Sequence, residues 1–144
     1  MAFRRSIFDQ IGLFDERLDV GQAGCSGDSE YWYRILAAGQ TCRYEPLAVV
    51  RHHHRLQIDG LASQIYHYMR GHTAALLVQY ERSRDSGNLR RAFVSLPWYY
   101  ARRLAVRAWR GSSPANRFLA QEIRGAIAGI WFYLRAPRPD AGSA

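Results

Sequence analysis

The sequence predicts an α/β chain in two parts, with short helices and strands in residues 1–57 and a mostly α-helical extension in residues 58–144. Two observations favour this fold class. Residues 41–44 and 47–51 have the character of extended segments, and the Glu45-Pro46 pair between them disfavours a helix. After residue 60, apolar residues recur at the three- and four-residue spacing of helices.

The first part opens with a short helix. Ser6 and Asp9 have the spacing of a helix capping box, and Gly12 is placed to end the helix. The following residues, 13–27, are rich in Gly, Asp and Ser, which predicts a loop. Within it, Asp15 and Glu16 are expected to cap or solvate a turn, whereas Phe14 and the later Tyr44 are expected in the core.

A second helix is predicted from Ser29 to Ala38, with Asp28 as its N-cap and Gly39 as its stop. Trp32, Ile35 and Leu36 give it an apolar face. Glu30 and Arg34 are four residues apart, in the order that favours an ion pair along a helix.

The extension reads as three helices. The first covers about residues 61–84, and the second covers about residues 89–110, where Pro97 should break or kink it. The third is expected to open with Ser113 as cap and Pro114 in its first turn, and to end before Pro137.

Charge divides the chain in the same way. All twenty basic residues of the 144 are Arg, and the formal net charge is +8. Residues 1–60 hold seven Arg and eight acidic residues, whereas residues 61–144 hold thirteen Arg and four acidic residues. A basic, aromatic extension suggests an anionic partner, such as a membrane surface, a nucleic acid or a phosphorylated lipid.

Cysteine content and hydropathy exclude several classes of protein. Cys25 and Cys42 lack the paired spacing of a zinc site and are too few for a disulfide scaffold, so we expect reduced thiols in a cytoplasmic protein. No signal peptide opens the sequence, and no stretch reaches the ~18–20 apolar residues of a membrane-spanning helix.

The chemistry is indicated by an ordered series of short motifs in residues 2–55. In order, they are Phe3-Arg4-Arg5, Gly12-Leu13-Phe14-Asp15-Glu16, Gly27-Asp28-Ser29-Glu30 with Arg34, Ala38-Gly39, Tyr44-Glu45-Pro46 and Val49-Val50-Arg51-His52-His53-His54-Arg55. None is specific alone. Their order and spacing resemble the second, acceptor-side half of family 2 glycosyltransferases and the related galactosyltransferase C-terminal region.

This resemblance implies the C-terminal part of a GT-A, Rossmann-like fold and an inverting transfer of sugar from a nucleotide-sugar donor to a hydroxyl acceptor. It gives Asp28 the role of general base, which removes the acceptor proton as the hydroxyl attacks the anomeric carbon. The positive end of a helix favours a carboxylate there. An ordinary helix cap is the alternative role for Asp28.

The neighbouring positions depart from the family pattern in one respect. The family commonly has Glu before the catalytic Asp, and here Gly27 stands in that place, which removes one carboxylate from acceptor binding. Gly27 and Glu30 are the predicted acceptor-binding residues, although the ion pair with Arg34 explains Glu30 equally well. The acceptor implied by the resemblance is a glycan or a lipid-linked sugar.

The His52-His53-His54 run is the predicted metal or diphosphate site. Alternate residues on a strand point the same way, so His52 and His54 could act together. In relatives, a His at this point ligates the metal or touches the diphosphate, so the complete enzyme is expected to use Mg²⁺ or Mn²⁺. The alternative is a polar strand end whose imidazoles form ordinary hydrogen bonds.

Two further expectations follow. The sequence has no counterpart of the nucleotide-binding half of a GT-A enzyme, with its Asp-x-Asp, so we expect a fragment with little or no activity alone. Residues 95–109 and 118–134 mix aromatics and Arg at helical spacing, which suits a cytoplasmic protein held at the inner face of the plasma membrane. Plain helix packing is equally compatible, and no motif indicates nucleic-acid binding. The rival function is a non-catalytic helical module that binds a membrane or a partner.

Overall fold

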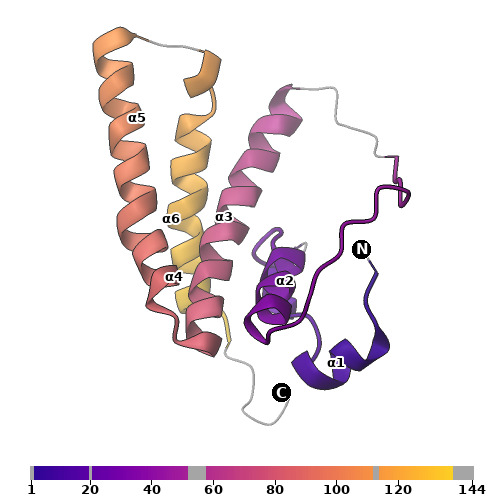
Figure 1. Cartoon of the computed structure of the whole chain (residues 1–144). Helices are drawn as coiled ribbons and strands as arrows, with labels where there is room; N and C mark the ends of the chain where they lie inside the picture. Colours follow the sequence, from indigo (N-terminus) through magenta and orange to yellow (C-terminus); the bar gives the residue numbers. More distant parts are fainter. Residues whose placement is uncertain (1, 20, 52–57, 112–113, 138–144) are drawn as a thin grey trace.

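The computed structural model describes residues 2–19, 21–51, 58–111 and 114–137, and all regular secondary structure within these ranges is helical (Figure 1). The elements in the first part are α1 (Arg5–Ile11), η1 (Glu16–Leu18) and α2 (Gly27–Ala37). The remainder comprises α3 (Ile58–Ser83), α4 (Ser86–Arg90), the π-helical η2 (Arg91–Ser95), α5 (Leu96–Arg110), η3 (Pro114–Asn116) and α6 (Leu119–Arg135).

The predicted α/β fold class, a GT-A sheet fragment with short strands, is wrong. No strand occurs among the described residues, and 40–51 form an irregular, extended path from α2 towards α3 (Figure 1). A strand needs a neighbour to complete its ladder of backbone hydrogen bonds, and this segment has none. Its apolar side chains are accordingly 79–88% exposed, namely Tyr44, Leu47, Val49 and Val50. Tyr44 is therefore not a core residue.

An aromatic cluster holds the first part together. Tyr31 on α2 is fully buried and stacks on Phe14, with ring centroids 4.2 Å apart, and on Phe8 of α1 at 5.8 Å. Phe3 meets Tyr31 edge-on at 5.2 Å and Trp32 at 5.5 Å. Offset and edge-on ring pairs contribute beyond the area they bury, so a short chain without a sheet still forms a core here.

The long helix α3 is the centre of the molecule, with α2 on one side and α6 on the other (Figure 1). Leu18 and Ala23 from the first part pack against Ala74, Ala75 and Val78 of α3. Residues of both predicted parts thus share one core at α3. A domain division at residue 57 stays a prediction.

Glycines bring α6 very close to α3. A Cβ added at Gly125 would lie 2.3 Å from the Tyr66 carbonyl oxygen, and one at Gly129 would lie equally close to that of Arg70. The four-residue spacing puts both glycines on one face of α6. The two backbones can approach this closely only because neither position carries a side chain.

The segment from α4 to α5 is a continuous helical run with a π-helical stretch at its middle. Pro97 was predicted to break or kink this helix, and the irregular turn lies directly before it, at Arg91–Ser95. Proline cannot donate to the carbonyl four residues back, and a widened turn accommodates its ring. This helical run also contributes to a second core. Its buried residues are Leu76, Leu77 and Ala92, and the partly buried Leu89, Leu96 and Ile130 pack against them.

No helix in the described part of the chain is both long and apolar enough to span a bilayer.

Candidate functional site

The N-terminus of α2 presents Asp28 to solvent. The loop before it turns sharply at Gly24 and Ser26, which have φ of 114° and 89°. Ser26, not Asp28, is the N-cap residue, and Asp28 is the second residue of the helix. The prediction that Asp28 is the cap is therefore wrong by two positions, because the left-handed Ser26 starts the helix earlier than the side-chain pattern indicates.

Asp28 has one engaged and one available carboxylate oxygen. Its Oδ1 accepts a hydrogen bond from the backbone N–H of Ser29 at 2.7 Å, with the Ser29 hydroxyl at 3.4 Å. No hydrogen bond or ion pair to Oδ2 occurs within the described ranges. An exposed carboxylate with a free oxygen in the first turn of a helix can accept a proton from a bound hydroxyl.

Gly27 is buried where the helix starts against the preceding loop. A Cβ there would lie 3.3 Å from Asp19 Oδ1 and 3.7 Å from the Leu18 carbonyl oxygen. A side chain at this position would require the Asp19 carboxylate to move. This movement is small and Asp19 is exposed, so the packing alone does not require glycine at position 27.

Glu30 lies on the opposite, buried face of α2. It is fully buried, and both carboxylate oxygens accept from Arg34 Nε, at 2.8 and 3.0 Å. Arg34 also donates to the carbonyl oxygens of Ile11 and Leu13, at 2.7 and 2.8 Å, and its guanidinium lies over the Tyr31 ring. The predicted Glu30–Arg34 pair is present, and it ties α2 to the end of α1.

The same ion network continues to α3, which the sequence did not suggest. Arg82 donates to Asp15 Oδ2 at 3.0 Å and lies 3.8 Å from Glu30 Oε1. Arg17 also donates to Asp15, at 2.8 and 2.9 Å, and its Nη1 reaches Glu81 at 3.2 Å. Asp15 caps η1 through the Arg17 N–H, as expected for a turn residue. Its pairing across 67 residues has no local sequence signal.

Asp15 is held in its charged form. Burial by itself would raise its pKa, but hydrogen bonds and charges from Arg17 and Arg82 outweigh burial and lower the pKa to about 2. The network of charges beside α2 is therefore satisfied internally, and its carboxylates are buried or half-buried, whereas Asp28 is exposed.

The loop that precedes α2 packs against α3. Gly71 packs directly under the Cys25 backbone, and the Cys25 thiol contacts the His67 carbonyl oxygen at 3.5 Å. Burial raises the pKa of Cys25, so this thiol is a poor nucleophile. The buried Nδ1 of His67 has no hydrogen-bond partner in the described structure.

His52 and His54, the predicted metal or diphosphate ligands, lie outside the described residues. Within the described ranges, nowhere do three or more His, Cys, Asp or Glu side chains come together as a metal site would require.

Comparison with known proteins finds a partial similarity to a glycosyltransferase. No protein-family model matches the chain, and no solved structure matches it. Over 65 residues, it is 35% identical to pre-mycofactocin glycosyltransferase from two strains of Mycobacterium tuberculosis, CDC 1551 / Oshkosh and ATCC 25618 / H37Rv. This covers 44% of the chain but only 13% of the relative's length. The chain is thus similar, over part of its length, to part of a glycosyltransferase.

Proposed function

We propose that this chain contributes the acceptor side of a glycosyltransferase, in which Asp28 is the general base for transfer of a sugar from a nucleotide-sugar donor to a hydroxyl acceptor. The observation that carries the proposal is the 65-residue similarity to a glycosyltransferase. The ordered motifs around Gly27-Asp28-Ser29-Glu30 agree with it.

The position of Asp28 suits the role of a base. A catalytic carboxylate must be exposed, yet fixed within hydrogen-bond reach of the acceptor hydroxyl. Asp28 is exposed, whereas the helix that carries it is fixed by the buried Glu30–Arg34 pair and the stacked Tyr31. In the inverting reaction, Asp28 Oδ2 takes the hydroxyl proton, the acceptor oxygen bonds to the anomeric carbon, and the nucleoside diphosphate leaves with the bonding electron pair.

The other assigned residues take different parts in this proposal. Glu30 sets the position of α2, since both of its oxygens face Arg34. Acceptor contact by Glu30 or by the Gly27 backbone stays a prediction, as does contact of His52 and His54 with a metal or diphosphate. The acceptor class, a glycan or a lipid-linked sugar, and the divalent ion belong to the proposal for the complete enzyme.

The test is Asp28→Asn made in the native gene, so that the chain keeps the partners it has in the cell. Extracts are supplied with radiolabelled nucleotide sugars, and label is counted in the glycan and lipid fractions. Loss of a general base lowers transfer by about a hundredfold to ten-thousandfold. The matched control is Asp9→Asn, which neutralises another exposed carboxylate, on α1.

Transfer unchanged by Asp28→Asn, in protein whose circular dichroism and abundance match the parent, would sink the proposal. The non-catalytic module would then be the better reading. Rapid turnover of a nucleotide sugar by the purified chain would contradict a different part, namely that this chain supplies only one side of the site.

A further inference from the structure

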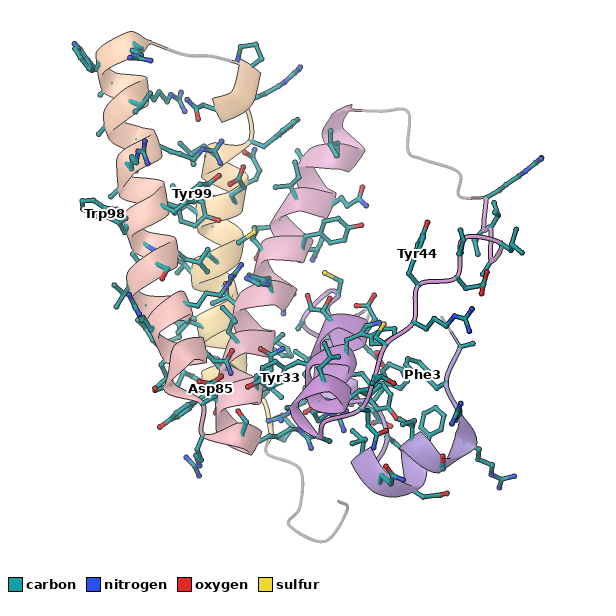
Figure 2. All side chains as sticks on the ribbon, in the orientation of Figure 1. Phe3, Tyr33, Tyr44, Asp85, Trp98 and Tyr99 are labelled. Carbon is teal, nitrogen blue, oxygen red and sulfur yellow. The ribbon has the colours of Figure 1, made fainter. Side chains whose placement is uncertain are left out.

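The helical run from α4 to α5 carries an outer face that packs against nothing in the described structure. Trp98 is 72% exposed and Trp109 is 83% exposed, although each has a large apolar ring system. They stand eleven residues apart, which is three helical turns, so both project from the same side of α5. In Figure 2, Trp98 points away from α6, whereas Tyr99 turns towards it.

The rest of this outer face is apolar or basic. Val94 lies four residues before Trp98 and is 59% exposed. Ala101, Arg102 and Ala105, between the two tryptophans, are exposed as well. The inner side of α5 is different: Tyr100 is buried, and Arg103 donates to Glu122 of α6 at 2.7 Å. The contacts to α6 therefore leave the tryptophan side uncovered.

The charged residues of the segment that forms this face are all arginines. From Ser86 to Gln121 the sequence has seven Arg and neither Asp nor Glu. Arg103 is paired with Glu122, but Arg90, Arg91 and Arg102 have no carboxylate partner among the described residues. Two shallow hollows run beside the tryptophan face and share Tyr99 as a wall. One is lined by Arg90 and Arg91, the other by Arg102 and Arg103.

We propose that this face, defined by Val94, Trp98, Arg102, Ala105 and Trp109, docks on the surface of an anionic phospholipid bilayer. Tryptophan is the side chain that settles at headgroup depth, with its ring in the apolar boundary and its N–H in the wet layer. Unpaired Arg on the same helix is attracted to the negative leaflet, and guanidinium suits phosphate. An amphipathic helix of this composition lies in the interface plane.

The composition of the face distinguishes this partner from a nucleic acid. Phosphate contacts need the Arg residues, but the apolar strip of Val94, Ala101 and Ala105 adds nothing to recognition of a sugar-phosphate backbone. In a bilayer the same strip is buried with the tryptophans. The inference does not depend on glycosyl transfer or on Asp28.

The test is co-sedimentation of the full chain with vesicles. Vesicles of phosphatidylcholine with an equal part of phosphatidylserine are compared with vesicles of phosphatidylcholine alone. We expect binding to the anionic vesicles, a blue shift of tryptophan fluorescence, and release by added salt as the charges are screened. Binding that is equal on both vesicles, or absent from both, would overturn the proposal.

Variants locate the contact. Trp98→Ala with Trp109→Ala should weaken binding at least about tenfold through lost apolar burial. The control is Trp131→Ala, since Trp131 is 56% exposed on α6. Arg91→Gln with Arg102→Gln should weaken binding about thirtyfold. Its control, Arg5→Gln with Arg135→Gln, removes the same charge from two exposed positions away from α5.

Each rival occupant has its own result. Equal losses in the test and control variants would show diffuse charge attraction without a docking face and would overturn the proposal. Self-association in sedimentation velocity that disappears in the Trp98→Ala, Trp109→Ala variant would assign the face to a second copy of the chain. Single-stranded RNA that binds the chain and displaces it from vesicles, with the same sensitivity to both tryptophans, would assign it to nucleic acid.

Discussion

The chain contains twenty arginines and no lysine, and the two regions around α3 use arginine in opposite ways. Beside α2, Arg17, Arg34 and Arg82 are each paired with a carboxylate. Along α4 and α5, Arg90, Arg91 and Arg102 have no such partner in the described part of the molecule. The first group holds elements together, and the second is available to something outside the fold.

This difference in the use of arginine follows from how the helices of each region are held together. The described residues of the first part form short helices and no strand, so buried ion pairs and stacked rings supply its cohesion. The α3–α6 pair has long helices in backbone contact and needs no charges at its centre. Its outer helix, α5, can therefore carry exposed tryptophan and unpaired arginine without being required for the core.

The largest expected effect comes from breaking the paired region at Glu30. The variant Glu30→Gln leaves Arg34 without its carboxylate partner in a buried site, whereas Arg82 keeps Asp15. Breaking such a buried pair costs about 3–5 kcal/mol. Urea unfolding followed by circular dichroism measures the loss. The matched control is Glu45→Gln, whose pair with Arg43 is largely exposed and should contribute under about 1 kcal/mol. Equal losses for the two variants would contradict the distinction between the regions.

A second break is expected at the contact between α3 and α6. In an exposed helix, Gly→Ala stabilises by up to about 1 kcal/mol. At Gly125 the added methyl would meet the Tyr66 carbonyl and Met69 Cβ, so we expect a loss of about 1–3 kcal/mol instead. Thermal or urea unfolding of Gly125→Ala tests this expectation: a loss of stability supports the close α3–α6 contact, and a gain contradicts it. Ala120→Ser on the exposed side of α6 is the control, with an effect below about 0.5 kcal/mol.

Helices were the part of this fold most accessible to sequence reasoning. The spacing of apolar residues found α3, α5 and α6, and the end before Pro137 is confirmed by the stop at Arg135. The strands were predicted from the residue types of 41–51, but a strand forms only beside a partner, and the described part of the chain offers none to this segment. Local pattern carries no information on whether a neighbour exists.

The candidate site shows the same limit. The Glu30–Arg34 pair is a four-residue spacing on one helix and could be predicted. The contacts of Asp15 with Arg82 and of Arg17 with Glu81 join residues more than sixty positions apart, and no pattern in the neighbouring sequence predicts them. Ser26 as N-cap was also missed, since its left-handed backbone and not its side chain starts α2.

The pairing of Asp15 makes the first region sensitive to acid. Its folded pKa of about 2 lies below the ordinary value of 3.8, so its contribution to stability is complete above about pH 4 and is lost as pH falls towards 2. The loss amounts to about 2 kcal/mol. Unfolding measured at steps between pH 5 and pH 2 should show it, and the step should be absent from Asp15→Asn, which is less stable at neutral pH. A parallel pH dependence in both proteins would show that Asp15 is not responsible.

The smallest expected change in stability comes from replacing exposed arginines of α5, in contrast to the paired arginines beside α2. Arg102→Gln and Arg107→Gln remove exposed guanidinium groups without breaking an ion pair in the described structure, so the free energy of unfolding should change by less than about 0.5 kcal/mol. Arg82→Gln is the contrasting variant, since it deprives Asp15 and Glu30 of a partner and should cost several times more. Urea unfolding of all three variants under one set of conditions gives the ranking. Substantial destabilisation by Arg102→Gln would place that residue among the structural arginines and remove it from the docking face, because a side chain held by the fold is not available to a membrane.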